Sequence, residues 1–169
     1  MRTDSWRRRG AAGYRPAAVN PAAGSDPTPL DEAGRALLIG AAREVARRAY
    51  APASKFPVGA AILAADGRVF VGCNVENASD GLSMCAERAA AFRMIADGAW
   101  RIVAVAIWTR LAEPGSPCGA CRQVLAEFAG PGCEVILAGT GETVVHTTLG
   151  ALLPRPFTFH DVESGAGTD

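Results

Sequence analysis

The sequence carries no excess of either charge and no long hydrophobic run. Its 169 residues include 17 basic and 17 acidic side chains, a formal net charge of zero. Proteins that bind nucleic acid usually present a strongly basic face, so this balance argues against nucleic acid as the main partner. No apolar run approaches the roughly 20 residues of a membrane span, and the start of the chain lacks the apolar segment of a secretory signal. We therefore expect no membrane partner and a cytoplasmic location.

The cysteines are few and odd in number, which does not suit a disulfide framework. In a reducing compartment, thiols more often serve as metal ligands or as small core residues. Two of them stand at C-x-x-C spacing, which is compatible with a metal site. The five are Cys73, Cys85, Cys118, Cys121 and Cys133.

Length and composition predict one folded domain. Hydrophobic residues make up 49% of the chain, enough to build a substantial core. Residues 1–28 mix Ala, Gly, Pro and Arg without apolar periodicity, so we expect a disordered basic leader there. The folded domain is expected over residues 29–163, followed by a frayed polar tail over 164–169.

The hydrophobic patterns predict an α/β fold. Thr28 is a candidate N-cap with Pro29 at the first helical position, and Pro52 ends that helix. Asp-Gly at 66–67, between two apolar stretches, indicates a hairpin. The order predicts a mixed five-stranded sheet with helices on both faces. The expected helices span about 29–50, 85–97, 119–129 and 149–153, and the strands 56–64, 69–73, 102–108, 134–138 and 142–146.

The most informative stretches are Cys-Ala-Glu at 85–87 and Pro-Cys-Gly-Ala-Cys at 117–121. Three thiolates can hold a zinc ion that prefers four ligands, which leaves one position for water, and zinc lowers the pKa of that water to about 7. Both stretches fall at predicted helix starts, where free N–H groups and the helix dipole stabilise thiolates. Glu87 is not needed as a ligand, so it is free to carry protons.

Two arginines follow the thiols closely. Arg88 and Arg122 could each donate a hydrogen bond to a ligand sulfur. We expect this supporting role for Arg88. Arg122 stays open between the same role and an ordinary position on the helix surface.

A closed structural zinc site is an alternative, and it requires a fourth protein ligand. Cys73 and Cys133 read as apolar positions at strand edges, and His146 and His160 as surface or core residues. Glu87 beside the thiols favours an open, catalytic zinc site instead.

Longer motifs surround the thiols, at 50–60, 72–78, 84–88, 116–123 and 152–154. With these motifs the chain resembles the zinc-dependent cytidine deaminase family, in its small homotetrameric type, from about Ala49 to Phe157. The resemblance implies a three-layer α/β/α cytidine deaminase-like fold and a homotetramer. It also implies a hydrolase that converts cytidine and 2′-deoxycytidine to uridine and 2′-deoxyuridine plus ammonia, in pyrimidine salvage.

The resemblance assigns the chemistry to the thiol motifs. Cys85, Cys118 and Cys121 match the zinc ligands, and Glu87 matches the residue that carries protons. The partner implied is a small-molecule nucleoside substrate, and the cofactor is Zn²⁺.

Five further residues match positions that hold the substrate. Asn74 and Glu76 match a pair that hydrogen-bonds the ribose, and residues two apart on a strand face the same side. Phe56 matches an aromatic residue that packs on the pyrimidine ring, and Ala86 one whose backbone touches the base. Phe157 matches an aromatic residue that a neighbouring subunit contributes to the site.

Some positions depart from the family pattern, namely Ala53, Asp80 and Ala89. The same chemistry on a modified cytosine nucleoside, such as an antibiotic of the blasticidin kind, is therefore an alternative. Glu76 favours a plain ribose or deoxyribose. A zinc-stabilised binding module without activity and a base editor of nucleic acid are further alternatives, against which Glu87 and the neutral charge balance argue.

Overall fold

The computed structural model describes residues 30–158, and the expected leader over 1–28 and tail over 164–169 lie outside this range. Five strands form one sheet in the order β2-β1-β3-β4-β5. The strands are β1 (Val58–Ala64), β2 (Val69–Cys73), β3 (Ile102–Thr109), β4 (Glu134–Ala138) and β5 (Val145–Thr148). The helices are α1 (Glu32–Ala46), the 3-10 helix η1 (Asp80–Leu82), α2 (Ala86–Ala96), α3 (Gly119–Phe128) and α4 (Leu149–Leu152).

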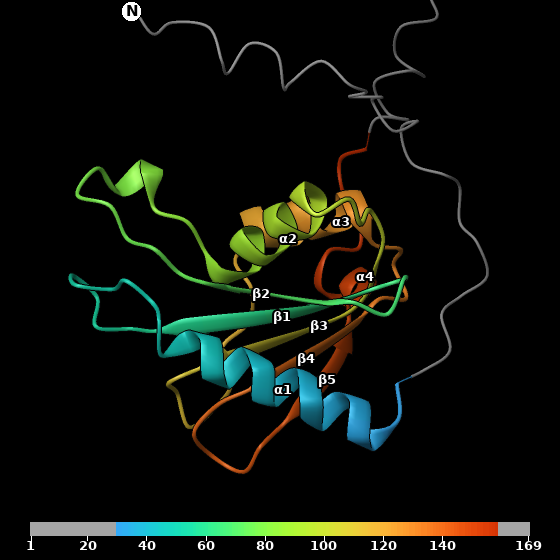
Figure 1. Ribbon diagram of the computed structural model, residues 1–169, viewed down its shortest axis with the longest axis horizontal. Helices are drawn as coiled ribbons and strands as arrows, with labels where there is room; N and C mark the ends of the chain where they lie inside the picture. Colours follow the sequence, from blue (N-terminus) through green and yellow to red (C-terminus); the bar gives the residue numbers. More distant parts are fainter. Residues whose placement is uncertain (1–29, 159–169) are drawn as a thin grey trace, which may run out of the picture.

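The sheet is mixed, and helices cover both of its faces. β1 runs antiparallel to β2 and β3, β3 and β4 are parallel, and β5 is antiparallel to β4. α1 lies on one face, while α2 and α3 lie side by side on the other (Figure 1). The predicted three-layer α/β/α fold is thereby confirmed.

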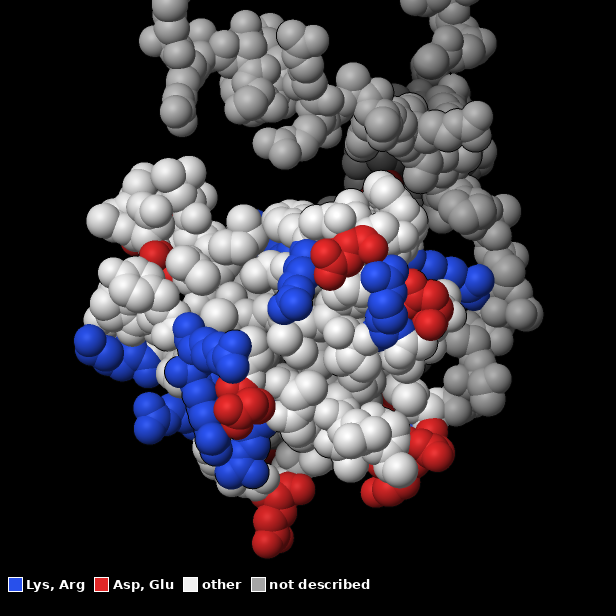
Figure 2. Space-filling model, viewed as in Figure 1, with Lys and Arg blue, Asp and Glu red and all other residues white. Residues whose placement is uncertain are grey.

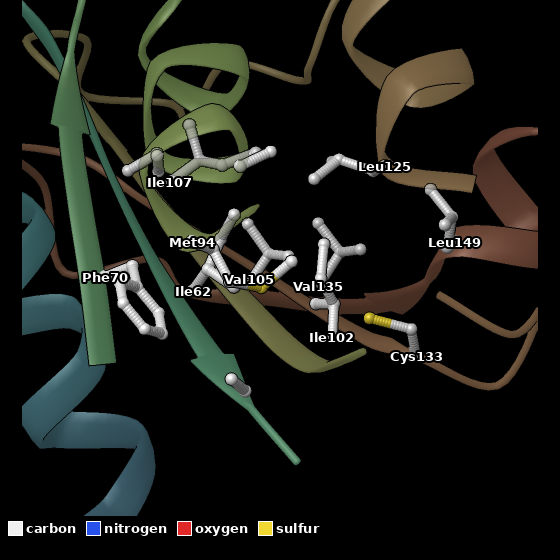
Figure 3. Close-up of a cluster of buried hydrophobic side chains, with 14 of the residues drawn as sticks. Ile62, Phe70, Met94, Ile102, Val105, Ile107, Leu125, Cys133, Val135 and Leu149 are labelled. Atoms are coloured by element: carbon white, nitrogen blue, oxygen red, sulfur yellow. The ribbon is translucent and has the colours of Figure 1, made fainter. Parts of the chain in front are cut away.

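The larger core lies between the sheet and the helices α2 and α3. Ile62, Val105 and Val135 from three neighbouring strands are fully buried there. They face Met94 of α2 and Leu125 of α3, which are also fully buried (Figure 3). Full burial of a side chain of this size contributes about 1.5–3 kcal/mol. This core therefore holds the two helices firmly against the sheet.

The core under α1 is built mainly from small side chains. Leu38 and Ala42 of the helix pack against Ala61, Ala104 and Ala106 of the sheet. Alternate residues of a strand point to opposite faces, so β1 and β3 contribute to both cores.

Two glycines allow the helices to approach the sheet backbone closely. A Cβ atom at Gly72 in β2 would collide with the backbone of α2 at Ala86. Gly59 in β1 is covered in the same way by the backbone of α1 at Ala42. The first turn of α2 therefore rests directly on β2, which fixes the position of the residues at the N-terminus of that helix.

The first helix differs from its predicted boundaries. Its N-cap is Asp31, whose Oδ1 accepts a hydrogen bond from Gly34 N at 2.8 Å, and the expected cap Thr28 lies outside the described residues. The helix ends at Ala46, earlier than predicted. The reason is tertiary, because the backbone of Tyr50 instead pairs with residues 74–76 next to β2.

The last strand also starts later than predicted. β5 begins at Val145, so the expected start at Glu142 is wrong. Thr140 N donates a hydrogen bond to Leu111 O at 2.8 Å, which ties the turn after β4 to the loop after β3.

Over residues 30–158, no helix is both long enough and apolar enough to cross a membrane.

Candidate active site

Three thiols meet where α2 and α3 begin. Cys85 is the N-cap residue of α2, Cys118 is that of α3, and Cys121 lies in the first turn of α3. The Sγ atom of Cys118 lies 3.4 Å from Sγ of Cys121 and 3.9 Å from Sγ of Cys85. All three Sγ atoms lie within 4.8 Å of one another. Packing α2 and α3 side by side thus gathers thiols that are far apart in the sequence.

The spacing of these sulfurs fits a zinc ion. A tetrahedral site with Zn–S distances of about 2.3 Å places neighbouring sulfurs about 3.8 Å apart. Within residues 30–158, no fourth His, Cys, Asp or Glu ligand atom joins the group. The Sγ of Cys133 instead donates to a backbone carbonyl, and His146 Nδ1 lies 3.1 Å from Glu134 Oε1. His160 lies outside the described range, so the described part of the chain supports a site with one position open to solvent.

The thiols differ in their electrostatic surroundings. Burial strongly raises the pKa of the Cys121 thiol, and the charge of Glu87 acts in the same direction. Burial also acts upward on Cys118, but hydrogen bonds from the backbone and thiol of Cys121 and from the thiol of Cys85 lower its pKa overall. A divalent cation binding at this cluster would displace the protons that the thiols hold.

Glu87 is the buried acid beside the thiols. It lies in the first turn of α2 and is only 4% exposed. Burial raises the pKa of its carboxyl group, while hydrogen bonds to its own backbone N–H and to Cys121, and the charge of Arg88, act in the opposite direction. A carboxyl group with a raised pKa is suited to exchanging protons near neutral pH.

Arg88 reaches the thiol cluster from the next position of α2. Its Nη2 lies 3.6 Å from Cys85 Sγ and 3.4 Å from the carbonyl oxygen of Ser83. Its Nε is buried without a hydrogen-bond partner among the described residues. A cation that donates to a ligand sulfur offsets the repulsion between neighbouring thiolates. The structure thus brings Arg88 next to Cys85, and its supporting role stays a prediction.

Arg122 holds the loop that leads into the cluster. Its Nε donates to Pro117 O at 2.8 Å, and its Nη1 donates to Leu152 O at 2.8 Å. Its Nη2 donates to the hydroxyl of Ser116 at 3.0 Å. Arg122, whose role the sequence left open, therefore links the segment before Cys118 to the end of α4.

Asn74 fixes the loop that precedes β1. Its Oδ1 accepts a hydrogen bond from Val58 N at 2.8 Å, and its Nδ2 donates to Phe56 O at 3.0 Å. An amide group has two donor hydrogens and two acceptor lone pairs, so one of each remains for another partner.

Glu76 faces the same loop from two residues further on. Its carboxylate accepts hydrogen bonds from Ala53 N at 2.8 Å and from the hydroxyl of Ser54. The hydrogen bond from Ser54 is the main factor that lowers the pKa of Glu76, so the group stays ionised. Ser54 lies in the motif at 50–60, but the sequence alone does not predict that its hydroxyl contacts Glu76.

The other three residues expected to contact the substrate differ in their exposure to solvent. Ala86 is buried at the first position of α2, and Phe56 is half-buried in the loop before β1. Phe157 is 67% exposed. The side-chain amide of Gln123 forms two hydrogen bonds with the backbone of Phe157. Gln123 Nε2 donates to Phe157 O at 2.7 Å, and Gln123 Oε1 accepts from Phe157 N at 3.1 Å. The sequence analysis assigned no role to Gln123, although it is the last residue of the motif at 116–123.

The fold and the thiol cluster together define a zinc-binding deaminase. The chain matches the family model described as "Cytidine and deoxycytidylate deaminase zinc-binding region" over residues 35–137. This protein therefore belongs to the cytidine and deoxycytidylate deaminase family.

Individual relatives cover most of the chain. A cytidine deaminase of Sporosarcina psychrophila is 43% identical over 129 residues, which are 76% of this chain and 95% of that protein. One from Mycobacterium tuberculosis is 43% identical over 126 residues, 75% of this chain and 91% of that protein. The crystal structure of cytidine deaminase from Burkholderia pseudomallei has a TM-score of 0.70 at 48% identity and covers 72% of this chain and 98% of that chain.

Proposed function

We propose that this chain catalyses the zinc-dependent hydrolytic deamination of cytidine and 2′-deoxycytidine to uridine and 2′-deoxyuridine, with release of ammonia. The observation that best supports this proposal is the buried Glu87, which contacts a cluster of three thiols at two helix N-termini. The relatives are named cytidine deaminases, which favours cytidine over a modified cytosine nucleoside. We place this reaction in pyrimidine salvage, in the cytoplasm.

The thiols supply the ligands and Arg88 supports them. Cys85, Cys118 and Cys121 would hold the zinc ion as thiolates. Bound there, zinc supplies Lewis-acid activation of the attacking water molecule. Arg88 keeps the Cys85 sulfur in place and offsets its negative charge through the contact at 3.6 Å.

Glu87 moves the protons of the reaction. Its carboxylate accepts a proton from the attacking water as the oxygen bonds to C4 of the cytosine ring. The same carboxyl group then delivers that proton to N3 of the ring. It next transfers the remaining hydroxyl proton to the amino nitrogen, so that the C4–N bond breaks and ammonia leaves. General acid–base help of this kind typically contributes about 10²–10⁴ in rate.

The substrate is held by residues of the loop before β1 and of the segment after β2, together with Ala86. The free donor and acceptor of Asn74, together with the ionised Glu76, suit the hydroxyl groups of a sugar. Phe56 packs on the pyrimidine ring, and the backbone of Ala86 contacts the base. The hydrogen bonds to residues 53–58 keep this loop in shape before the nucleoside arrives.

The test is deamination of free cytidine by the purified, zinc-loaded chain, followed as the loss of cytidine and the appearance of uridine. Replacing Glu87 with Gln keeps the shape of the side chain and removes its proton exchange. We expect about 10²–10⁴-fold lower kcat with unchanged zinc content. Glu142→Gln, on an exposed turn, is the matched control and keeps full activity. Normal turnover in the Glu87 variant would rule out its role.

The proposed assembly is a homotetramer in which Phe157 serves a neighbouring subunit. The high exposure of Phe157 and the fixed backbone around it support this arrangement. Phe157→Ala and Glu87→Gln should each be nearly inactive alone, and co-expression of the two should restore activity, because some mixed sites then hold both intact residues. Absence of any recovery, in an assembly shown to contain both chains, would contradict the shared site.

A further inference from the structure

A hollow of about 510 Å³ lies at the C-terminal end of α1, apart from the thiol cluster. Pockets for small organic molecules have volumes of about 300–1,000 Å³. None of the residues assigned above to deamination lines it. The lining residues that matter here are Arg47, Lys55, Pro57, Trp108 and Arg110.

The hollow follows from the way in which α1 ends. Gly59 brings the last turns of α1 against β1, and the helix stops at Ala46, while β3 runs on to Thr109. Trp108 pairs with Gly59 in the sheet register, so the indole stands beside the end of the helix. Ala46, Ala49 and Ala51, which have small side chains, also line the hollow.

Trp108 gives the hollow a fixed aromatic wall. Its Nε1 donates a hydrogen bond to Gly139 O at 3.0 Å, which sets the orientation of the indole. The residue is only half-buried, and it lines the hollow. A planar ring can stack on an indole held in this way.

Three cations and no carboxylate line the hollow, although the chain as a whole is neutral. Figure 2 shows Lys and Arg side chains gathered around the C-terminal end of α1, at the left of the view. Arg47 is paired with Glu44 at 3.0 Å on the outer surface of the helix. The side chains of Lys55 and Arg110 form no hydrogen bond or ion pair with another residue of the described range. The charge of Lys55 also helps to lower the pKa of Glu76, but without an ion pair between them, so both cations can still pair with an incoming anion.

The backbone of Lys55 has an unusual conformation. Its φ of 57° lies in the left-handed region, which a residue with a Cβ atom rarely adopts. A hydrogen bond from Lys55 N to Ala51 O at 3.0 Å closes the loop in this conformation. The backbone of Lys55, whose residue lines the hollow, is thereby held in place.

We propose that this hollow binds a small phosphorylated compound with a planar ring, of the nucleotide class. The phosphate groups lie toward Lys55 and Arg110, since guanidinium and ammonium groups form strong charge-assisted hydrogen bonds with phosphate. The ring lies against Trp108. None of the lining residues is assigned to deamination, although Lys55 directly precedes Phe56 and its charge helps to lower the pKa of Glu76.

The test is calorimetric titration of the zinc-loaded full chain with ADP, in the presence of saturating uridine to occupy the deaminase centre. We expect saturable binding at one site per chain. Arg110→Glu and, independently, Lys55→Glu should each weaken it at least about tenfold, because each places a negative charge where phosphate binds. Arg93→Glu, an equal charge change on α2 at the opposite face, is the matched control and leaves ADP binding unchanged.

Adenosine and inorganic pyrophosphate separate the two halves of the ligand. Each should bind more weakly than ADP, since each lacks one of the two contacts. The proposal is overturned if ADP does not bind saturably, if uridine displaces it, or if both charge reversals leave its affinity unchanged. Pyrophosphate binding as tight as that of ADP would equally overturn it, because the ring would then contribute nothing.

Discussion

The two faces of the sheet are packed in different ways. On the face of α2 and α3, large side chains such as Met94 and Leu125 are fully buried against the strands. On the face of α1, four of the six buried residues are alanines, among them Ala42, Ala61 and Ala104. Interdigitated large side chains leave few voids and resist displacement. The thiol cluster thus stands on the deeper core, whereas the face with small side chains leaves a hollow at its edge.

The first prediction concerns the thiol cluster itself. Cys118→Ala should reduce the zinc content to near zero, because two thiols cannot complete the site. Activity should fall by more than the about 10²–10⁴-fold expected from losing the proton carrier alone. Removal of zinc from the unmodified chain with a chelator should have the same effect, and re-addition should reverse it. Zinc per chain and the rate of cytidine loss are measured together.

Cys73→Ala is the matched control, since Cys73 is a thiol at the end of β2 that does not belong to the cluster. It should retain zinc and activity. Equal loss of zinc in the two variants would show that the cluster is not the metal site.

The second prediction separates the two faces. Gly72→Ala and Gly59→Ala should each destabilise the chain by about 1–3 kcal/mol, because a Cβ atom would collide with the backbone of the covering helix. Only Gly72→Ala should also weaken zinc binding and activity, since it displaces the start of α2. Urea unfolding gives the free energies, and zinc titration gives the affinities. Similar zinc loss in the Gly59 variant would break the distinction between the faces.

The third prediction concerns the ion pairs on the α1 face. Glu134 accepts from Arg35 Nε at 2.7 Å and lies 3.1 Å from His146 Nδ1. Burial acts to raise the pKa of Glu134, but these two partners outweigh it and lower the pKa overall. Glu134→Gln should therefore cost about 1–2 kcal/mol of unfolding free energy at neutral pH.

The pH dependence follows from the same shift. A carboxyl group whose pKa is lower in the folded state stabilises the fold above its unfolded pKa of about 4.3. That contribution is lost as the pH falls below this value and through the folded pKa. Urea unfolding of the two chains should thus give free energies that converge in acid. A difference that stays constant from neutral pH to pH 3 would contradict the pairing.

The smallest effect is expected at Gly40, on the exposed side of α1. A Cβ atom there meets nothing within 4 Å. Gly40→Ala should stabilise the chain by about 0.5–1 kcal/mol, because glycine is a poor helix former. Zinc affinity should stay unchanged, as measured in the same titrations. A destabilised variant would show that this side of α1 is covered in the assembled protein.

Local patterns in the sequence were enough to place most elements of the fold. The Asp-Gly pair at 66–67 marked the hairpin between β1 and β2, and the apolar run of β3 marked a buried strand. The boundaries that failed depend on distant contacts. α1 stops early because Tyr50 pairs beside β2, and β5 starts late because Thr140 is bound to Leu111.

The chemical content of the candidate site was also readable from the sequence. The cysteines and Glu87 stood at predicted helix starts, and the structure places Cys85 and Cys118 at the two N-caps. The contacts that hold the surroundings were not readable. Arg122 donates a hydrogen bond to the backbone of Leu152, and Gln123 donates one to the backbone of Phe157. These partners are about 30 residues apart in the sequence, so no local sequence pattern predicts the contacts.

The sequence by itself determined which groups are available, namely three thiols, one neighbouring acid and the helices that begin at them. It did so because residue type sets the chemistry and short-range spacing sets where a helix starts. Only the tertiary structure decided that the two helix N-termini meet, with Cys85 Sγ 3.9 Å from Cys118 Sγ, and that Glu87 is buried beside them. That distance arises from the packing of α2 and α3 on one face of the sheet, and the hollow at Trp108 arises from where α1 stops on the other.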